Sequence, residues 1–164
     1  MSPEYAVYAL SLAFFNQHGF DILCASPPVG TDPRFYRCLL PRRDLKSSVR
    51  GLRDEVDLTV RSGLNVILLE CKVKLSHSLS TLNSLGESDD VKLRRIVASH
   101  SKPELLHLLS RSTGAILSPA SSVHCALIVG EVDCALPLGI TVIEVQEQGY
   151  NVWVTPSMRD VLPR

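Results

Sequence analysis

Apolar and polar residues alternate most regularly over residues 55–60, where every second position is apolar. That period predicts a β-strand with one buried face. Residues 65–73 instead form a nearly continuous apolar run, which is typical of a strand covered on both faces. Because side chains two positions apart on a strand point the same way, Glu70 and Lys72 at the end of this run share one face.

A hairpin loop centred on residues 62–63 would join these two strands. In that register Glu55 lies opposite Glu70, and Asp57 becomes a diagonal neighbour of Glu70 on the same side of the sheet. A slip of one residue would send the acids to opposite faces. Buried carboxylates that share a site need a positive partner, and a divalent metal ion with Lys72 beside it is the simplest one.

The remaining pattern predicts an α/β fold, a central mixed β-sheet flanked by helices, in a single domain over residues 1–164. The first helix begins after Ser2 and ends at residues 18–19. Further predicted helices lie over residues 75–85, from Ser88, and from Pro103 to Gly114; further strands lie over residues 20–25, 34–40, 123–129, 140–145 and 150–154. The strands at 20–25, 55–60 and 65–73 would form a meander, and later strands would return through helical crossovers.

Composition narrows the class of protein. The chain has 164 residues, of which 45% are hydrophobic, enough for one domain with a sizeable core. No apolar run approaches the roughly 20 residues of a membrane span, and no export signal is visible. Five cysteines, an odd number without a CxxC pair, are typical of reduced thiols. We therefore expect a cytoplasmic protein with no membrane partner.

Basic residues are concentrated just before the strand at 55–60, although the net charge of the chain is zero. The segment contains Arg34, Arg37, Arg42, Arg43, Lys46, Arg50 and Arg53, against the single acid Asp44. Such a stretch attracts a phosphate backbone, mostly without sequence preference, so these residues are candidates for nucleic-acid binding. The alternative is a solvated loop with no ligand.

The pattern Asp57…Glu70-Cys71-Lys72, with an apolar run before the ExK and a helix carrying an acid upstream, resembles the PD-(D/E)xK nuclease superfamily. Type II restriction enzymes, archaeal Holliday-junction resolvases and nuclease domains of CRISPR-associated effectors belong to it. The sequence around Asp57 and Glu70 is most similar to that of the last two groups. The resemblance covers the order of elements over roughly the first hundred residues, but only a few identical positions. Val56 stands where the superfamily's name has proline.

The resemblance implies a restriction-endonuclease-like fold and a metal site. Asp57, Glu70 and the backbone carbonyl of Cys71, with Glu55 as a further candidate, would hold Mg²⁺ or Mn²⁺, because these hard cations prefer oxygen ligands. Lys72 would help position or deprotonate the attacking water and stabilise the transition state. The alternative is an exposed ion pair between Glu70 and Lys72 or a cross-strand arginine, which is worth at most about 1 kcal/mol.

Two further site residues follow from the resemblance, each with a structural alternative. The first helix of the superfamily often carries an acid to the metal, and Glu4 is the only acid of this helix; a first-turn glutamate also simply complements the helix dipole. The second core helix often supplies a basic residue. Lys92 is the first candidate and Arg95 the second, and the alternative for both is a solvated helix face.

The sequence thus predicts a metal-dependent endonuclease that hydrolyses phosphodiester bonds, with DNA as the expected partner. A ribonuclease, and a non-catalytic nucleic-acid-binding or assembly subunit on the same fold, remain as alternatives. A homodimer is compatible with cutting both strands of a duplex, but no stretch identifies an interface.

Overall fold

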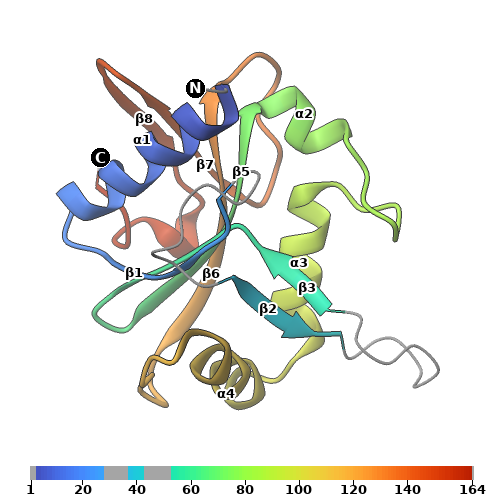
Figure 1. The fold of residues 1–164 in the computed structure, drawn as a ribbon, viewed down its shortest axis with the longest axis vertical. Coiled ribbons are helices and arrows are strands. Elements are labelled where there is room, and N and C mark those ends of the chain that lie inside the picture. The colour runs from blue at the N-terminus through green and yellow to red at the C-terminus, as the bar shows by residue number, and fades with distance from the viewer. Residues whose placement is uncertain (1–2, 28–36, 43–52, 164) are drawn as a thin grey trace.

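The computed structural model describes residues 3–27, 37–42 and 53–163, and it shows an α/β fold (Figure 1). A six-stranded mixed sheet forms the middle layer in the order β1-β4-β5-β6-β7-β8. Its strands are β1 (Asp21–Ala25), β4 (Leu58–Ser62), β5 (Asn65–Lys74), β6 (Ser122–Glu131), β7 (Thr141–Gln146) and β8 (Gly149–Trp153). The predicted α/β class, with a mixed sheet and flanking helices, is confirmed.

The sheet changes from antiparallel to parallel at β5. Strands β1, β4 and β5 are antiparallel neighbours and form the predicted meander, whereas β5, β6 and β7 run parallel. Between β5 and β6 the chain passes through α2 (Leu75–Ser80), α3 (Asp89–Ser99) and α4 (Lys102–Thr113), as a parallel neighbour requires. The predicted helical crossover is wrong for β7, because residues 132–140 contain no helix. Strand β8 returns antiparallel beside β7.

Helices cover both faces of the sheet (Figure 1). Helix α1 (Pro3–Gln17) packs against one face, where Phe15 and Ile67 belong to the same buried cluster. Helices α3 and α4 pack against the other face, together with a two-stranded sheet of β2 (Cys38–Pro41) and β3 (Arg53–Val56). The 3-10 helix Pro156–Met158 lies near the end of the described chain and buries Met158 beneath the α1 side.

Strand β5 lies at the centre and is the strand predicted to be covered on both faces. Residues 66–69 are completely buried. Ile67 and Leu69 belong to the cluster beneath α1, and Val66 and Leu68 to the cluster beneath α3 and α4. The alternation carries on beyond the core, so Glu70 and Lys72 face α3 whereas the side chain of Cys71 faces α1.

The hairpin between β4 and β5 differs from its prediction in register. Its loop consists of residues 63–64, and Thr59 pairs with Leu68, so the register lies two residues from the predicted one. A shift of two preserves the parity, and Asp57 therefore stays on the same side as Glu70.

The predicted strand over residues 55–60 is wrong as a single element. It is broken at a bend at Asp57, with β3 on one side and β4 on the other. Strand β3 pairs with β2, and Glu55 lies opposite Leu39 rather than opposite Glu70.

The helix ends are close to those predicted from the sequence. The Ser101 side chain accepts a hydrogen bond from the backbone N–H of Glu104 at the start of α4, and Gly114 ends that helix in a left-handed conformation. Helix α2 stops at Ser80, which is earlier than predicted. Within the described ranges, no helix is both long enough and apolar enough to cross a bilayer.

Candidate active site

Asp57 occupies the bend where the chain leaves the small sheet and enters the central one. Its Oδ2 accepts a hydrogen bond of 2.9 Å from the backbone N–H of Cys71 on β5. Its own carbonyl accepts one of 2.8 Å from the backbone N–H of Ser26, just after β1. These two bonds fix the Asp57 carboxylate beside the Glu70–Lys72 segment.

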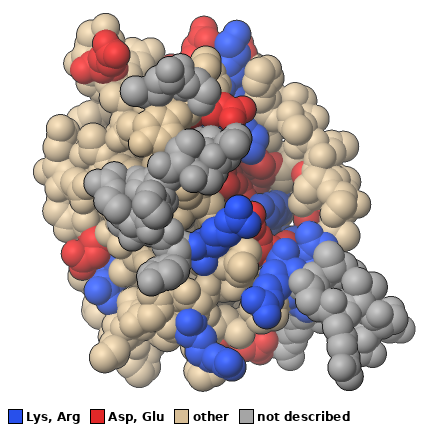
Figure 2. All heavy atoms as spheres, viewed as in Figure 1, with Lys and Arg blue, Asp and Glu red and all other residues tan. Residues whose placement is uncertain are grey.

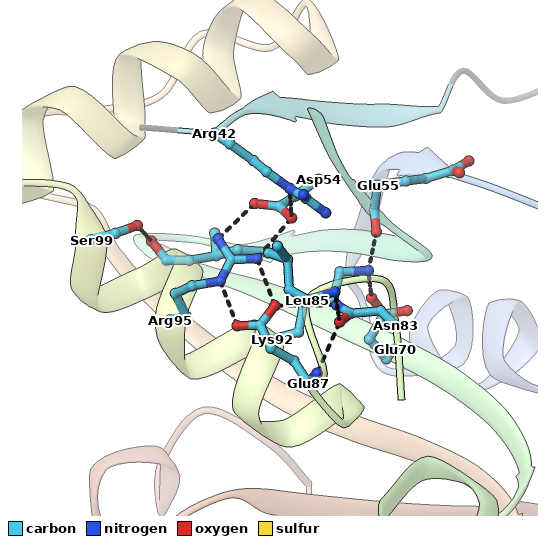
Figure 3. A network of polar contacts seen from close by, with 11 residues as sticks. Arg42, Asp54, Glu55, Glu70, Asn83, Leu85, Glu87, Lys92, Arg95 and Ser99 are labelled. Carbon is cyan, nitrogen blue, oxygen red and sulfur yellow. Dashed lines mark hydrogen bonds and ion pairs between the residues drawn. The ribbon is translucent and has the colours of Figure 1, made fainter. Parts of the chain in front are cut away.

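Glu70 is buried at the end of the apolar run and is only 2% exposed. The Lys92 ammonium, from α3, donates a short hydrogen bond to Glu70 Oε1 and another of 2.5 Å to the carbonyl of Glu55 (Figure 3). Burial and then the charge of Asp57 raise the pKa of Glu70 well above its ordinary value, while Lys92 opposes this rise. The Asp57 and Glu70 carboxyl groups thus lie close enough that the charge of Asp57 disfavours ionisation of the buried Glu70.

Lys72 lies on the same face as Glu70 but has a different partner. Its Nζ is 3.3 Å from Oδ2 of Asp89, in the first turn of α3. Within the described ranges, Lys72 makes no ion pair with Asp57 or Glu70. Burial lowers the pKa of Lys72, but the charges of Asp89, Asp57 and Glu70 together outweigh burial and raise the pKa. The ammonium is therefore held in its charged form beside the two carboxylates.

A polar cavity of about 290 Å³ opens over Asp57. Its lining includes Glu4 from α1, Arg37, Glu55, Asp57 and Lys72. In Figure 2 acidic and basic side chains meet on the visible face of the molecule. Elements far apart in the sequence thus contribute charged groups to a single cavity.

The resemblance predicted Glu4 and Lys92 as further site residues, and the structure places both of them near Asp57 or Glu70. Glu4 lines the cavity, and Lys92 contacts Glu70 directly. Glu55 also lines the cavity, but its carboxylate is 3.3 Å from the Arg37 guanidinium, and its backbone carbonyl, rather than its side chain, contacts Lys92.

A divalent cation fits the donor set around Asp57. Within the described ranges no three acidic, histidine or cysteine side chains form a preformed metal site. Asp57 and Glu70 would supply one carboxylate each. The N–H of Cys71 donates to Asp57 and Cys71 lines the cavity, so its backbone carbonyl would be the third oxygen donor. This all-oxygen set suits Mg²⁺ or Mn²⁺.

The predicted nucleic-acid-binding residues have separate outcomes. Arg37 lines the cavity, and Arg53 is exposed at the start of β3. Arg42 is instead buried in an ion pair of 3.0 Å with Asp54. The other four candidates lie outside the described residues; these are Arg34, Arg43, Lys46 and Arg50.

Beside the cavity, a buried ionic network joins β3 to α3 (Figure 3). Arg95 donates to both oxygens of Asp54, at 2.9 and 2.8 Å, and to Glu87 at 2.6 Å. Burial raises the pKa of Asp54, but hydrogen bonds and charges from Arg95 and then Arg42 hold it below its usual range. Arg95, the second candidate for a basic site residue, therefore binds β3 to the helix that carries Lys92.

Two residues near the site were not identified from the sequence. Asp89 holds Lys72, although its position in the first turn of a helix already gave it a local explanation. The hydroxyl of Ser26 is buried against the cavity and has no hydrogen-bond partner in the part of the chain that the structure describes. A lone serine after a predicted strand carries no signal that would single it out.

Comparison with protein-family models, curated proteins and solved structures finds no family model that matches this chain and no significant match among the proteins or the structures.

Proposed function

We propose that this protein is a metal-dependent phosphodiesterase of the PD-(D/E)xK type, most simply a DNA endonuclease. One observation carries the proposal: the bond from the Cys71 N–H to Asp57 Oδ2 brings the acid at the bend before β4 against the Glu70-Cys71-Lys72 segment of β5. The raised pKa of the buried Glu70 supports it, because neighbouring carboxyl groups of this kind are stabilised by a cation.

In this proposal the side chains have different roles. Asp57, Glu70 and the Cys71 carbonyl hold Mg²⁺ or Mn²⁺, which when bound neutralises phosphate charge and makes water more acidic. Lys92 offsets the negative charge of Glu70. Lys72, held charged at the cavity, stabilises the negative charge that develops on the scissile phosphate. Its raised pKa favours this electrostatic role over that of a general base.

The proposed fold relationship is restriction-endonuclease-like. Its support is the order of elements around the site: an N-terminal helix carrying Glu4, an antiparallel β1-β4-β5 meander carrying Asp57 and Glu70, and a return through helices to a parallel β6. Arg37 at the cavity and the exposed Arg53 favour a polyanionic substrate. The buried pair of Arg42 with Asp54 reduces the basic surface available to it.

The test is an incubation of the protein with labelled linear, circular, single-stranded and four-way-junction DNA and with RNA, in Mg²⁺, Mn²⁺ or EDTA. We expect cleavage that requires the metal and is lost in Glu70→Gln and in Lys72→Met. Glu131→Gln is the matched control, because Glu131 ends the neighbouring strand β6 in an exposed pair with Lys74, outside the cavity.

Cleavage of RNA alone would select the ribonuclease alternative. Metal-independent binding of nucleic acid without cleavage would select the non-catalytic subunit and contradict the proposal. Cleavage by Lys72→Met at the wild-type rate would remove the proposed role of that lysine.

A further inference from the structure

Two adjacent acids, Asp89 and Asp90, begin α3, and both are almost completely buried. Each has its own serine and its own basic partner. Asp90 accepts from the Ser88 hydroxyl at 2.5 Å and from Arg94, one turn further along the same helix, at 2.8 Å. The helix dipole favours both carboxylates equally and accounts for neither choice of partner. Their difference therefore comes from tertiary contacts.

Asp89 faces the end of β5 rather than its own helix. Its Oδ2 accepts a hydrogen bond of 2.8 Å from the Ser78 hydroxyl and lies 3.3 Å from the Lys72 ammonium. Ser78 is completely buried on α2, the helix that directly continues β5. The three residues thus form a clamp, Lys72–Asp89–Ser78, in which the serine fixes the carboxylate and the carboxylate fixes the lysine.

The clamp decides which acid the Lys72 ammonium contacts. The charges of Asp89, Asp57 and Glu70 all act on this ammonium. Within the described residues, only Asp89 is within ion-pair distance. A lysine side chain is a point charge on a flexible four-carbon stem, so an ammonium released from Asp89 would move to the nearest remaining carboxylates. Those are the two acids that the proposed function assigns to the cation.

Because Lys92 already pairs with Glu70, the position of Lys72 decides how much negative charge the two carboxylates keep. Its ammonium already contacts Glu70 and the Glu55 carbonyl. A second ammonium on Glu70 or Asp57 would neutralise both carboxylates with the protein's own cations, and a divalent ion would then have to displace it. An amine that stays beside the carboxylates without pairing to them leaves the pair open to an ion from solution.

We propose that Asp89 is a positioning residue of this site, which holds Lys72 at the cavity but off Asp57 and Glu70. Lys72 then does not add to the neutralisation by Lys92, and the two carboxylates keep the negative charge that attracts a divalent cation. This inference rests on the proposed function. It adds to that function a residue that contacts neither the cation nor the substrate, and it explains why two neighbouring acids at one helix end have different partners.

The test measures Mn²⁺ binding by calorimetry in Asp89→Asn and in Asp90→Asn. The two variants remove the same charge from the same helix turn, but only the first releases Lys72. We expect Asp89→Asn to weaken binding roughly 10-fold, at the lower end of the range for residues that orient a metal site, and Asp90→Asn to stay within about twofold of the wild type. In a Lys72→Ala background, Asp89→Asn should weaken binding no further, since no ammonium is left to move.

Equal weakening by the two single variants, or a 10-fold effect that persists in the Lys72→Ala background, would overturn the inference while leaving the proposed function intact. A wild-type protein that binds no Mn²⁺ would overturn both. If Asp89→Asn does not fold, Ser78→Ala replaces it, because that variant keeps every charge and removes only the bond that fixes Asp89. A weaker affinity for Mn²⁺ then supports the clamp, and wild-type affinity rejects it.

Discussion

Replacing Lys92 with methionine should destabilise the protein strongly, because it leaves Glu70 as a buried and uncompensated carboxylate. Glu70 is 2% exposed, and the Lys92 side chain is 16% exposed. Breaking a buried pair by removing one partner costs about 3–5 kcal/mol in the free energy of unfolding. We expect about 3 kcal/mol, at the low end, because Lys92 retains some contact with water.

The assay is urea unfolding followed by the fluorescence of Trp153, the only tryptophan. Lys74→Met is the control, because Lys74 also forms an ion pair, but its side chain and that of its partner Glu131 are 46% and 56% exposed, and the loss should stay below about 1 kcal/mol. Adding Glu70→Gln to Lys92→Met should restore most of the lost stability, since no unpaired charge then remains. Equal losses in Lys92→Met and Lys74→Met would refute the reasoning.

The deficit of Lys92→Met should also depend on pH. Burial and Asp57 raise the folded-state pKa of Glu70 above 4.5, so the folded state binds more protons than the unfolded state between these two values, and stability falls as the pH rises through them. Lys92 lowers this pKa, so its removal raises it further. The difference between variant and wild type should therefore be smallest at acidic pH, where Glu70 is protonated in both folded proteins, and should grow as the pH rises through the two raised pKa values.

Two further predictions concern the framework around the site. Asp54→Asn should cost about 3–5 kcal/mol, since it breaks the buried pairs with Arg95 and Arg42. These ion pairs hold the pKa of Asp54 below 3.8. Their stabilisation is therefore present above that value and is lost as the pH falls through the lowered pKa. The melting temperature of the variant should accordingly fall less steeply on acidification than that of the wild type. Gly130→Ala should cost about 1–3 kcal/mol in urea unfolding, because its Cβ would lie 2.7 Å from Val7 Cγ2; wild-type stability would contradict this packing.

The sequence predicted that Asp57 and Glu70 share a face, because the face of a side chain depends only on whether the register shifts by an even or an odd number of residues. The period of two fixes which side chains point together, and the observed register shift of two residues leaves that parity intact. The break at Asp57 could not be predicted in the same way. Apolar and polar residues alternate through residues 55–60 without interruption, although β3 buries alternate residues and β4 buries its first three. The partner of β3 is a strand that only the tertiary fold brings near.

Charged residues were harder to assign than strands, because each had a sufficient local explanation. Arg42 lies in a basic run that suggests a solvated or phosphate-binding surface, yet it pairs with Asp54 inside the protein. Asp89 fits the first turn of any helix, yet it holds Lys72. In both cases the deciding partner lies on another element, and nothing in the neighbouring sequence indicates which element that is.

With every group ionised, the carboxylates at the site outnumber the ammonium groups. Three carboxylates, Asp57, Glu70 and Asp89, face two ammonium groups, Lys72 and Lys92, which leaves one negative charge in excess when all are ionised. Lys92 is committed to Glu70 and Lys72 to Asp89. Asp57 accepts from the neutral Cys71 N–H, lies beside the Glu70 carboxyl whose pKa it raises, and lines the cavity. The excess charge lies at the cavity, unlike the network of Asp54 and Glu87 around Arg95, and it is the charge that the proposed divalent cation would neutralise.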